Sequence, residues 1–308
     1  MVRVVIALGG NTLLDPRDNG TVDQQVERIE TTAKEIVTAI EAGHEVVVTH
    51  GNGPQIGNLL LQQESAPDTP QLPLDVLVAE TQAQIGYLLQ QALDNRLAGA
   101  QDFLTVVTQV VVDADDPAFA EPTKPIGPFY TGTEAADKSF KTERVGTGDR
   151  PYRRVVPSPE PEEIVEADEI AEMVDRGNHV ICGGGGGVPV VDREGYVGIE
   201  AVIDKDLTSQ ELATAIDADR LVILTDVEYA YLDYHTGDQQ PLEAVTPADL
   251  APHLDAGQFG AGSMRPKIEA SRRFVERGGD LAAITTPDRL LPALEGTAGT
   301  RVRADPPV

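Results

Sequence analysis

The apolar positions of the chain form short buried runs that alternate with stretches of helical spacing. Residues 2–8 are a run of apolar side chains that ends in a glycine pair, which predicts a buried strand. Residues 22–40 carry apolar side chains at helical spacing after Thr21, whose Gln three residues later completes a capping box. Residues 45–49 predict a second buried strand.

The same alternation continues to the end of the chain. Strands and helices in turn indicate an α/β fold with an open, mainly parallel sheet whose two faces are covered by helices. Further strands are predicted at 103–112, 179–182, 221–224 and 281–285, and further helices at 74–97, 166–176, 263–277 and 290–294, with one more beginning near Thr208, where Glu211 suggests a second capping box.

Residues 113–160 interrupt this pattern with closely spaced prolines, glycines and charges. The segment is too long for a simple connection, so we interpret it as an inserted subdomain. A structureless excursion is the alternative, but apolar side chains such as Ile126 and Val155 favour order. We expect one domain with two lobes, at about 1–205 and 206–308, without a distinct linker between them.

Composition places the protein among large globular chains. With 308 residues, 41% of them hydrophobic, it can bury a substantial core. The single cysteine, Cys182, excludes an internal disulfide. The sequence contains no run of 18 apolar residues and no recognisable signal peptide, so we expect a cytoplasmic protein without a membrane partner.

The charge balance is strongly acidic. The sequence has 51 Asp and Glu against 24 Lys and Arg, which gives a formal net charge of −27. Such a surface repels nucleic acid and anionic membranes, so neither is an expected partner. A merely acidic protein is one interpretation; we favour adaptation to the salt-rich cytoplasm of a halophile, where ions screen the repulsion.

Three predicted strands end in glycine-rich loops, which suits anion binding at the carboxyl edge of a parallel sheet. Glycine tolerates positive φ and lets backbone N–H groups approach a phosphate. One such loop alone is better explained as a tight turn, whereas three loops at the same sheet edge favour anion binding. No Walker loop, dinucleotide fingerprint or metal-binding motif occurs, so we expect no protein-built metal site. The loop residues are Gly9, Gly10 and Asn11, then Gly51, Asn52 and Gly53, and finally residues 183–187.

Three of the six lysines lie beside turns or helix starts. Lys267 follows a glycine-rich turn at the beginning of a predicted helix, Lys205 stands between two aspartates, and Lys124 stands in a proline-stiffened loop. Each could be an ordinary surface lysine. Together they could surround a phosphoryl group, because phosphoryl transfer chiefly needs cations and N–H donors around the phosphate oxygens. Asp206 could orient the lysines without acting as a base.

Several motifs in the same order resemble those of carbamate kinases, members of the amino-acid-kinase superfamily. The similarity extends from about residue 4 to residue 285. The motifs are VIALGGN at 5–11, THGNGPQ with GNLL at 49–60, VTQVVVD at 107–113, PTKPIGP at 122–128, VVPSP at 155–159, Cys182 with its glycines, EAVIDKD at 200–206 and GSMRPKIE at 262–269.

This resemblance implies an open α/β/α sandwich with a protruding subdomain, usually as a homodimer. It implies reversible phosphoryl transfer between carbamoyl phosphate with ADP and carbamate with ATP, dependent on Mg²⁺. In organisms that ferment arginine through the arginine deiminase pathway, this reaction makes ATP. The lobe at 1–205 would hold the carbamoyl group and the lobe at 206–308 the nucleotide.

The resemblance also implies roles for single residues. Lys124 would contact carbamoyl phosphate from the subdomain, Lys205 and Lys267 would stabilise the moving phosphoryl group, and Asp206 would position them. The glycine loops would supply anion contacts at Gly9, Gly10, Asn11, Gly51, Asn52 and Gly53, and the nucleotide side would include Thr225, Asp226 and Met264.

Two departures from the wider superfamily affect the choice of function. Ala7 stands where many relatives have the lysine of a K-x-G-G motif, which fits carbamate kinase and argues against acetylglutamate or aspartate kinase. Arg265 stands where an apolar residue is more usual, as a phosphate contact or a surface feature. Another small-molecule kinase of this fold and a non-catalytic ligand-sensing module remain the alternatives.

Overall fold

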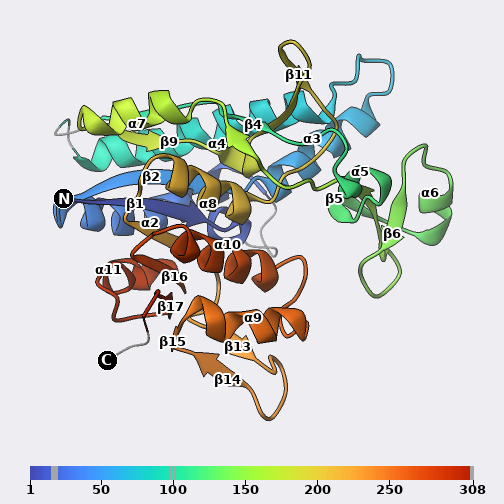
Figure 1. Cartoon of the computed structure of the whole chain (residues 1–308). Helices are drawn as coiled ribbons and strands as arrows, with labels where there is room; N and C mark the ends of the chain where they lie inside the picture. Colours follow the sequence, from blue (N-terminus) through green and yellow to red (C-terminus); the bar gives the residue numbers. More distant parts are fainter. Residues whose placement is uncertain (15–19, 98, 100–101, 306–308) are drawn as a thin grey trace.

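The centre of the molecule is an eight-stranded sheet (Figure 1). The structure, a computed structural model, describes residues 1–14, 20–97, 99 and 102–305, and at Asn11 it describes the backbone alone. Neighbouring strands are parallel except for β16 and β17. In sheet order the strands are β15 (Ala244–Val245), β17 (Thr300–Val302), β16 (Leu281–Thr285), β12 (Arg220–Leu224), β1 (Val2–Leu8), β2 (His44–His50), β9 (His179–Ile181) and β3 (Phe103–Thr105).

Helices cover both faces of this sheet, because its central strands are apolar on both sides. In β1, Val5 and Ala7 belong to one buried cluster, whereas Val4 and Ile6 belong to the cluster on the opposite face. The expected α/β/α sandwich with a mainly parallel sheet is confirmed. The first face packs against α7 (Ala167–Asp175), α8 (Lys205–Ala215) and α10 (Met264–Glu276), and the second against α2 (Val22–Glu41), α4 (Leu74–Leu97) and α11 (Leu290–Leu294).

Four adjacent parallel strands end at one edge of the sheet. Leu8 at the end of β1 is in register with His50 of β2 and with Leu224 of β12. Ile181 at the end of β9 is in register with Val48 of β2. The three glycine-rich segments and the Thr225 turn therefore leave the sheet side by side, as the strand pattern predicted.

The predicted strand at 103–112 is wrong as a single element. Residues 103–105 form β3 in the central sheet, and β4 (Gln109–Val111) belongs to a second sheet. Between them, the buried side chain of Gln82 accepts from the Thr108 N–H at 2.9 Å and donates to the Thr108 carbonyl at 3.0 Å. The Thr108 carbonyl also accepts from the Val188 N–H of the second sheet at 2.8 Å, so the backbone leaves the central sheet here while its polar groups stay paired.

The helix expected near Thr208 begins earlier, at Lys205. Its N-cap is Asp204, whose carboxylate accepts from the Asp206 N–H at 3.0 Å. Thr208 is fully buried, and its hydroxyl donates to the Gly186 carbonyl at 2.8 Å. The apolar period hid this start because the first turn of α8 is charged.

Residues 124–156 form a small sheet that protrudes from the body (Figure 1, right). It contains β5 (Lys124–Tyr130), β7 (Tyr152–Val156) and β6 (Thr142–Arg144), all antiparallel, with α6 (Gly132–Ala136) beside them. Ile126 and Val156 attach it to the body by packing with Ile56 and Leu60 of α3 (Gly53–Ser65). The segment is therefore ordered, while the boundaries of the two lobes stay a prediction.

Several smaller elements were not predicted from the sequence, among them β15 and β17 of the central sheet. The others are β11 (Tyr196–Gly198), β10 (Val188–Asp192) and β8 (Glu163–Ile164), which join β4 in the second sheet, the hairpin of β13 (Ala230–Leu232) and β14 (Gln240–Leu242), and the helices α1 (Gly10–Leu13), α5 (Pro117–Ala120) and α9 (Pro247–Asp255).

No described helix is long and apolar enough to cross a membrane.

Candidate active site

A cavity of about 380 Å³ lies at the carboxyl edge of the central sheet. The three lysines selected from the sequence all line it: Lys124 from the start of β5, Lys205 from the first turn of α8, and Lys267 from the first turn of α10. Segments far apart in the sequence thus bring three ammonium groups to one space, beside the amides of the glycine loops.

Asp206 lies between two of the ammonium groups. Its Oδ1 accepts from Lys205 Nζ at 2.5 Å and its Oδ2 from Lys267 Nζ at 2.8 Å. The Asp206 side chain is 4% exposed and each lysine side chain 12%, so water screens these pairs little. One carboxylate therefore fixes both cations at the cavity wall and leaves one positive charge in surplus.

The ionisation of this group follows from burial and pairing. Burial alone would raise the pKa of Asp206, but the two ammonium groups outweigh it and hold that pKa well below its usual range. Burial lowers the pKa of Lys205, only partly opposed by Asp206. For Lys267 burial also acts downward, yet the attraction of Asp206, Asp204 and Asp226 prevails and raises the pKa.

Asp204 also pairs with Lys124, in addition to capping α8. Its Oδ2 accepts from Lys124 Nζ at 2.6 Å, while its Oδ1 holds the Asp206 N–H. The first strand of the protruding sheet is thereby connected to the helix that carries Lys205. The sequence analysis treated Asp204 only as a neighbouring charge; an aspartate two residues before Asp206, in N-cap position, was the signal that could have identified it.

The glycine loops divide into residues that line the cavity and residues that allow close packing. A Cβ at Gly51 would lie 3.1 Å from the Gly10 nitrogen, so the first two loops touch through their backbones. Gly9, expected to contact the substrate, does not line the cavity, and its N–H donates to the Leu224 carbonyl at 3.0 Å. The lining members are Gly10, Gly51, Asn52 and Gly53, joined by Gly185, whereas the side chain of Asn11 lies outside what the structure describes.

The five-glycine segment mainly serves close packing. Gly185 and Gly186 both have positive φ, and a Cβ there would lie 2.1 Å from the Asn52 amide nitrogen and 2.3 Å from the Ile203 carbonyl, respectively. Any larger residue would therefore collide with the neighbouring loops that carry Asn52 and Ile203. Asn52 is held in turn by a bond from its Nδ2 to the Thr81 hydroxyl at 2.9 Å.

A smaller cavity of about 240 Å³ adjoins the first. It contains all three residues expected on the nucleotide side, Thr225, Asp226 and Met264, together with the aromatic side chains of Tyr231, Tyr234 and Phe259. Ser263 and Lys267 line both cavities. Two ligands, one in each cavity, would therefore approach each other near Lys267.

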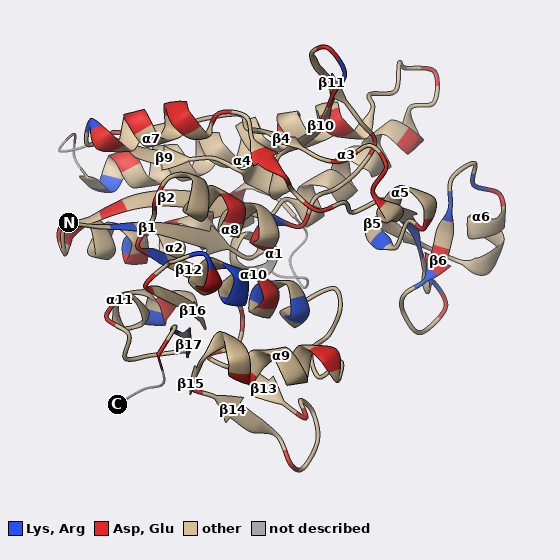
Figure 2. Ribbon diagram, viewed as in Figure 1, with Lys and Arg blue, Asp and Glu red and all other residues tan. Residues whose placement is uncertain are grey.

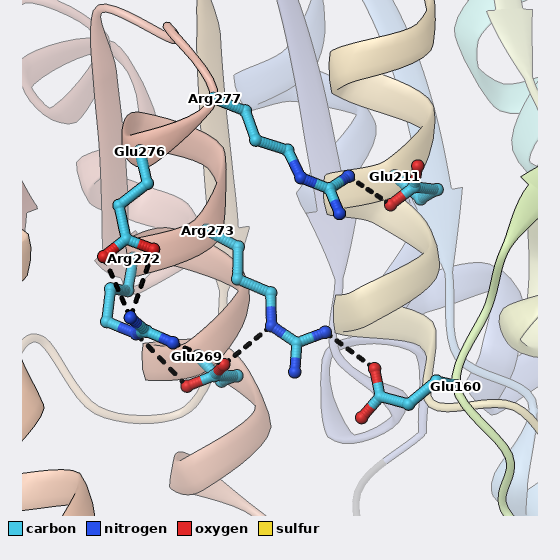
Figure 3. A network of polar contacts seen from close by, with 7 residues as sticks. All are labelled: Glu160, Glu211, Glu269, Arg272, Arg273, Glu276 and Arg277. Carbon is cyan, nitrogen blue, oxygen red and sulfur yellow. Dashed lines mark hydrogen bonds and ion pairs between the residues drawn. The ribbon is translucent and has the colours of Figure 1, made fainter.

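An ion-pair network fixes α10 against its neighbours (Figure 3). Arg273 contacts Glu269 on its own helix and Glu160 after the protruding sheet, and Arg277 contacts Glu211 of α8. Glu211 is thus an ion-pair partner and not part of the capping box suggested by the sequence. Arg265 donates to the Leu254 carbonyl at 3.1 Å and does not line the lysine cavity, so its position supports a structural role.

Arg153 on β7 is a cavity residue that the sequence analysis missed. It lines the larger cavity beside Lys124, and its Nε donates to the Gly127 carbonyl at 3.0 Å. Within the described part of the chain, no group of three or more His, Cys, Asp or Glu side chains is arranged to hold a metal ion.

This combination of an α/β/α sandwich and a lysine-rich cavity at its sheet edge is that of a small-molecule kinase. A family model described as the amino acid kinase family matches residues 2–286. The chain belongs to the amino acid kinase family. The expectation of a phosphotransferase enzyme is thereby confirmed.

Within the family, the similarity is to carbamate kinases over nearly the whole chain. The chain is 52% identical to the carbamate kinase of Halobacterium salinarum, covering 98% of both chains. It is 47% identical to that of Thermococcus kodakarensis, covering 98% of this chain and 99% of the other. A solved structure of carbamate kinase from Giardia lamblia bound to AMP-PNP superposes with a TM-score of 0.91 at 40% identity, covering 99% of each chain. The resemblance expected from the motifs is confirmed.

Proposed function

We propose that this protein is a carbamate kinase that transfers a phosphoryl group reversibly between carbamoyl phosphate with ADP and carbamate with ATP. The observation that carries the proposal is the convergence of Lys124, Lys205 and Lys267 on one cavity that adjoins a second cavity at Lys267. The full-length similarity to carbamate kinases supports this substrate pair over other phosphoryl acceptors.

The chemistry needs positive charge and alignment more than acid–base catalysis. In the direction of ATP formation, the P–O bond to the carbamoyl group breaks, a bond forms to a terminal oxygen of ADP, and carbamate leaves as an anion. The attacking oxygen of ADP is already deprotonated, so no base is required. Lys205 and Lys267 would stabilise charge on the moving phosphoryl group, and the ionised Asp206 would hold them in place without acting as a base.

The two cavities suggest which substrate binds where. The smaller cavity is lined only by residues between 225 and 267, and its aromatic side chains offer flat apolar surface for an adenine ring. We therefore assign the nucleotide to the lobe at 206–308, with Thr225, Asp226 and Met264 among its contacts. The carbamoyl group would bind in the larger cavity, where Lys124 would exchange its contact with Asp204 for the substrate.

Mg²⁺ is proposed to enter with the nucleotide. Asp204 and Asp206 already accept from lysines, but the Asp226 carboxylate accepts from a weaker donor, the Thr225 hydroxyl at 3.2 Å. Asp226 and the nucleotide phosphates would hold the ion, because Mg²⁺ in kinases usually binds one or two carboxylates plus phosphate oxygens. When bound, the ion supplies positive charge for phosphate oxygens that the lysines do not contact.

The deciding experiment is a coupled assay for ATP formed from ADP and carbamoyl phosphate, with Mg²⁺, at several KCl concentrations. We expect turnover that requires both substrates. A protein shown to be folded by circular dichroism but without turnover above background at any salt concentration would reject the proposal. Acetylglutamate, aspartate and UMP, tested as acceptors with ATP, would reveal another kinase of this family; binding of ATP without turnover of any acceptor would indicate a ligand-sensing module.

We also propose that the protein forms a homodimer through the β3 edge of the central sheet. β3 is the last strand of that sheet, and exposed apolar side chains lie on it, at Leu104, and near it, at Tyr87 and Val107. An edge strand flanked by apolar groups is suited to a symmetric contact with a second copy. Light scattering in molar KCl should give the mass of a dimer, and Tyr87→Glu should shift it to that of a monomer; a monomeric wild-type protein would contradict the proposal.

The proposed reaction also suggests a cellular setting. We propose a cytoplasmic enzyme that makes ATP during arginine fermentation in a salt-rich cell, which agrees with the net charge of −27. Cell fractionation and loss of growth on arginine without oxygen after gene deletion would test this setting.

A further inference from the structure

Arg153 differs from the other cations of the larger cavity because no described carboxylate pairs with it. Lys124 contacts Asp204, and Lys205 and Lys267 both contact Asp206. The Arg153 guanidinium instead uses Nε to hold the Gly127 carbonyl and lies 5.0 Å from the centre of the Phe129 ring. In a sequence with 51 acidic residues, a partly buried arginine without a carboxylate partner is unexpected.

These contacts leave one side of the guanidinium available. The bond to Gly127 uses Nε, and among the described residues the two terminal nitrogens have no hydrogen-bond partner. The aromatic ring and the backbone carbonyl hold the planar group in place, so little further order would be lost when it binds a ligand. A guanidinium fixed in this way is suited to two parallel hydrogen bonds with a phosphate or carboxylate.

The charge of the cavity favours an anion at this position. Four cations and two carboxylates line it, which leaves two positive charges in excess inside a molecule of net charge −27. Arg153 lines only the larger cavity, whereas Lys267 also borders the smaller one. An anion held by Arg153 and Lys124 would therefore lie on the side away from the proposed nucleotide.

We propose that Arg153 is a substrate-binding residue that contacts the anionic oxygens of carbamoyl phosphate, and of carbamate in the reverse direction. This role rests on the proposed function. It makes the protruding sheet a direct part of the substrate site through two residues, Lys124 on β5 and Arg153 on β7, and it explains why a desolvated cation is kept there without a carboxylate.

The neighbouring residue provides a matched control. Arg154 lies on the same strand, pairs with Glu200 at 2.7 Å and does not line the cavity. Arg153→Gln keeps a side-chain amide that can donate to the Gly127 carbonyl, whereas Arg153→Lys keeps the charge but loses the planar fork. Arg154→Gln removes an arginine from the same strand without altering the cavity.

Steady-state kinetics with each substrate varied separately tests the proposal. We expect Arg153→Gln to raise KM for carbamoyl phosphate on the order of 10- to 100-fold, as for loss of hydrogen bonds to a charged group, with KM for ADP changed less than about threefold. Arg153→Lys should recover only part of this loss, and Arg154→Gln should behave like the wild type. An unchanged KM for carbamoyl phosphate in Arg153→Gln, or an equal rise in Arg154→Gln, would overturn the proposal while leaving the kinase function standing.

A binding measurement separates this role from the proposed reaction. Carbamoyl phosphate without nucleotide should raise the unfolding temperature of the wild type and of Arg154→Gln, but not that of Arg153→Gln. Mg²⁺ with ADP should stabilise all three equally. If the wild type has no turnover, the proposed function fails, and the same measurement with carbamoyl phosphate still decides whether Arg153 holds this anion. Equal stabilisation of Arg153→Gln and wild type would overturn the assignment.

Discussion

Lys267 is the residue whose removal best separates catalysis from binding. It borders both cavities and is held by Asp206 at 2.8 Å, the position expected for a cation that follows the phosphoryl group from one substrate to the other. We expect Lys267→Ala to lower kcat on the order of 10²-fold, because the lost contact acts chiefly in the transition state.

The control for this change is Lys34→Ala, which removes a lysine with a 71% exposed side chain on α2 and should leave kcat unchanged. Rates would be measured at saturating carbamoyl phosphate and ADP. A Lys267→Ala variant with normal kcat and a raised KM would move this lysine out of the catalytic role and into substrate binding.

The buried ring of His50 predicts that the folded protein loses stability in acid. It is buried at the end of β2, and burial lowers its pKa to about 4 although its ring bonds to the Gly51 carbonyl. In the unfolded chain the His50 ring takes up a proton near pH 6.5, whereas in the folded chain it does so only near pH 4. Stability is therefore lost as pH falls from about 6.5 to 4, by about 3 kcal/mol at 1.36 kcal/mol per pKa unit.

Denaturant unfolding at pH 7 and pH 4.5 would measure this loss. His50→Gln removes the titrating ring, so its unfolding free energy should fall less between these pH values than that of the wild type. Asp206 does not interfere, because its lowered pKa places its contribution at more acidic pH. Equal losses in wild type and variant would show that other groups cause the acid sensitivity.

At the scale of elements, α10 connects the catalytic residues to the rest of the molecule. Its Arg273 reaches Glu160 at 2.6 Å and Glu269 at 2.6 Å, and its Arg277 reaches Glu211 of α8 at 2.5 Å (Figure 3). These ion pairs lie outside the cavity. The Arg277–Glu211 pair joins the end of α10 to α8, the two helices whose first turns carry Lys267 and Lys205, and so helps to hold the two ammonium groups at a fixed separation.

Removing the two ion pairs of Arg273 should have a small effect that depends on salt. We expect Arg273→Gln to lower the unfolding free energy by about 1 kcal/mol in 0.1 M KCl and by less in 2 M KCl, because ion pairs that are partly exposed are weak and are screened. Arg176→Gln, which removes an i,i+4 pair with both side chains more than two-thirds exposed, is the control and should change it less. A larger loss at high salt than at low salt would contradict this account.

The elements that the sequence predicted correctly are those with a continuous apolar run or with apolar side chains at helical spacing. The 2–8 strand, the helix at 74–97 and the helix after Thr21 all have this character, and the capping box of Thr21 with Gln24 is present. The prediction of one strand at 103–112 failed because the apolar run continues through Thr108, where the chain changes sheets and the distant side chain of Gln82 bonds the backbone. Such a contact leaves no local signal in the chain.

The site was predictable to the same extent and for similar reasons. The lysines and glycine loops stand beside predicted turns and helix starts. Their motifs and the order of the strands therefore predicted that they meet at one edge of the central sheet. Asp204 and Arg153 were missed because each looks like an ordinary surface charge until its environment is known. Arg153 and Arg154 are adjacent in the sequence, and only the structure shows that one lines the cavity and the other pairs with Glu200.

At the scale of the whole molecule, the site is a positive region in an acidic protein. Figure 2 shows Asp and Glu on helices and loops throughout, whereas Lys and Arg gather on α10 and on the protruding strands. Anionic substrates must approach a molecule of net charge −27 to reach a cavity with excess positive charge. Salt would weaken the long-range repulsion while leaving the buried contacts in the cavity nearly unchanged, since these are poorly screened.

This charge distribution predicts that stability rises with salt, and the shape of the rise identifies its cause. Repulsion among 51 acidic side chains should be relieved mostly below 1 M KCl, because the Debye length falls from about 10 Å at 0.1 M to about 3 Å at 1 M. We expect the unfolding temperature to increase on the order of 10 °C over this interval, equivalent to a few kcal/mol. Stabilisation by solute exclusion would instead keep increasing above 1 M and would be reproduced by sucrose. Calorimetry in KCl and in sucrose distinguishes the two, and an unfolding temperature that stays constant between 0.1 and 2 M KCl would contradict adaptation to a salt-rich cell.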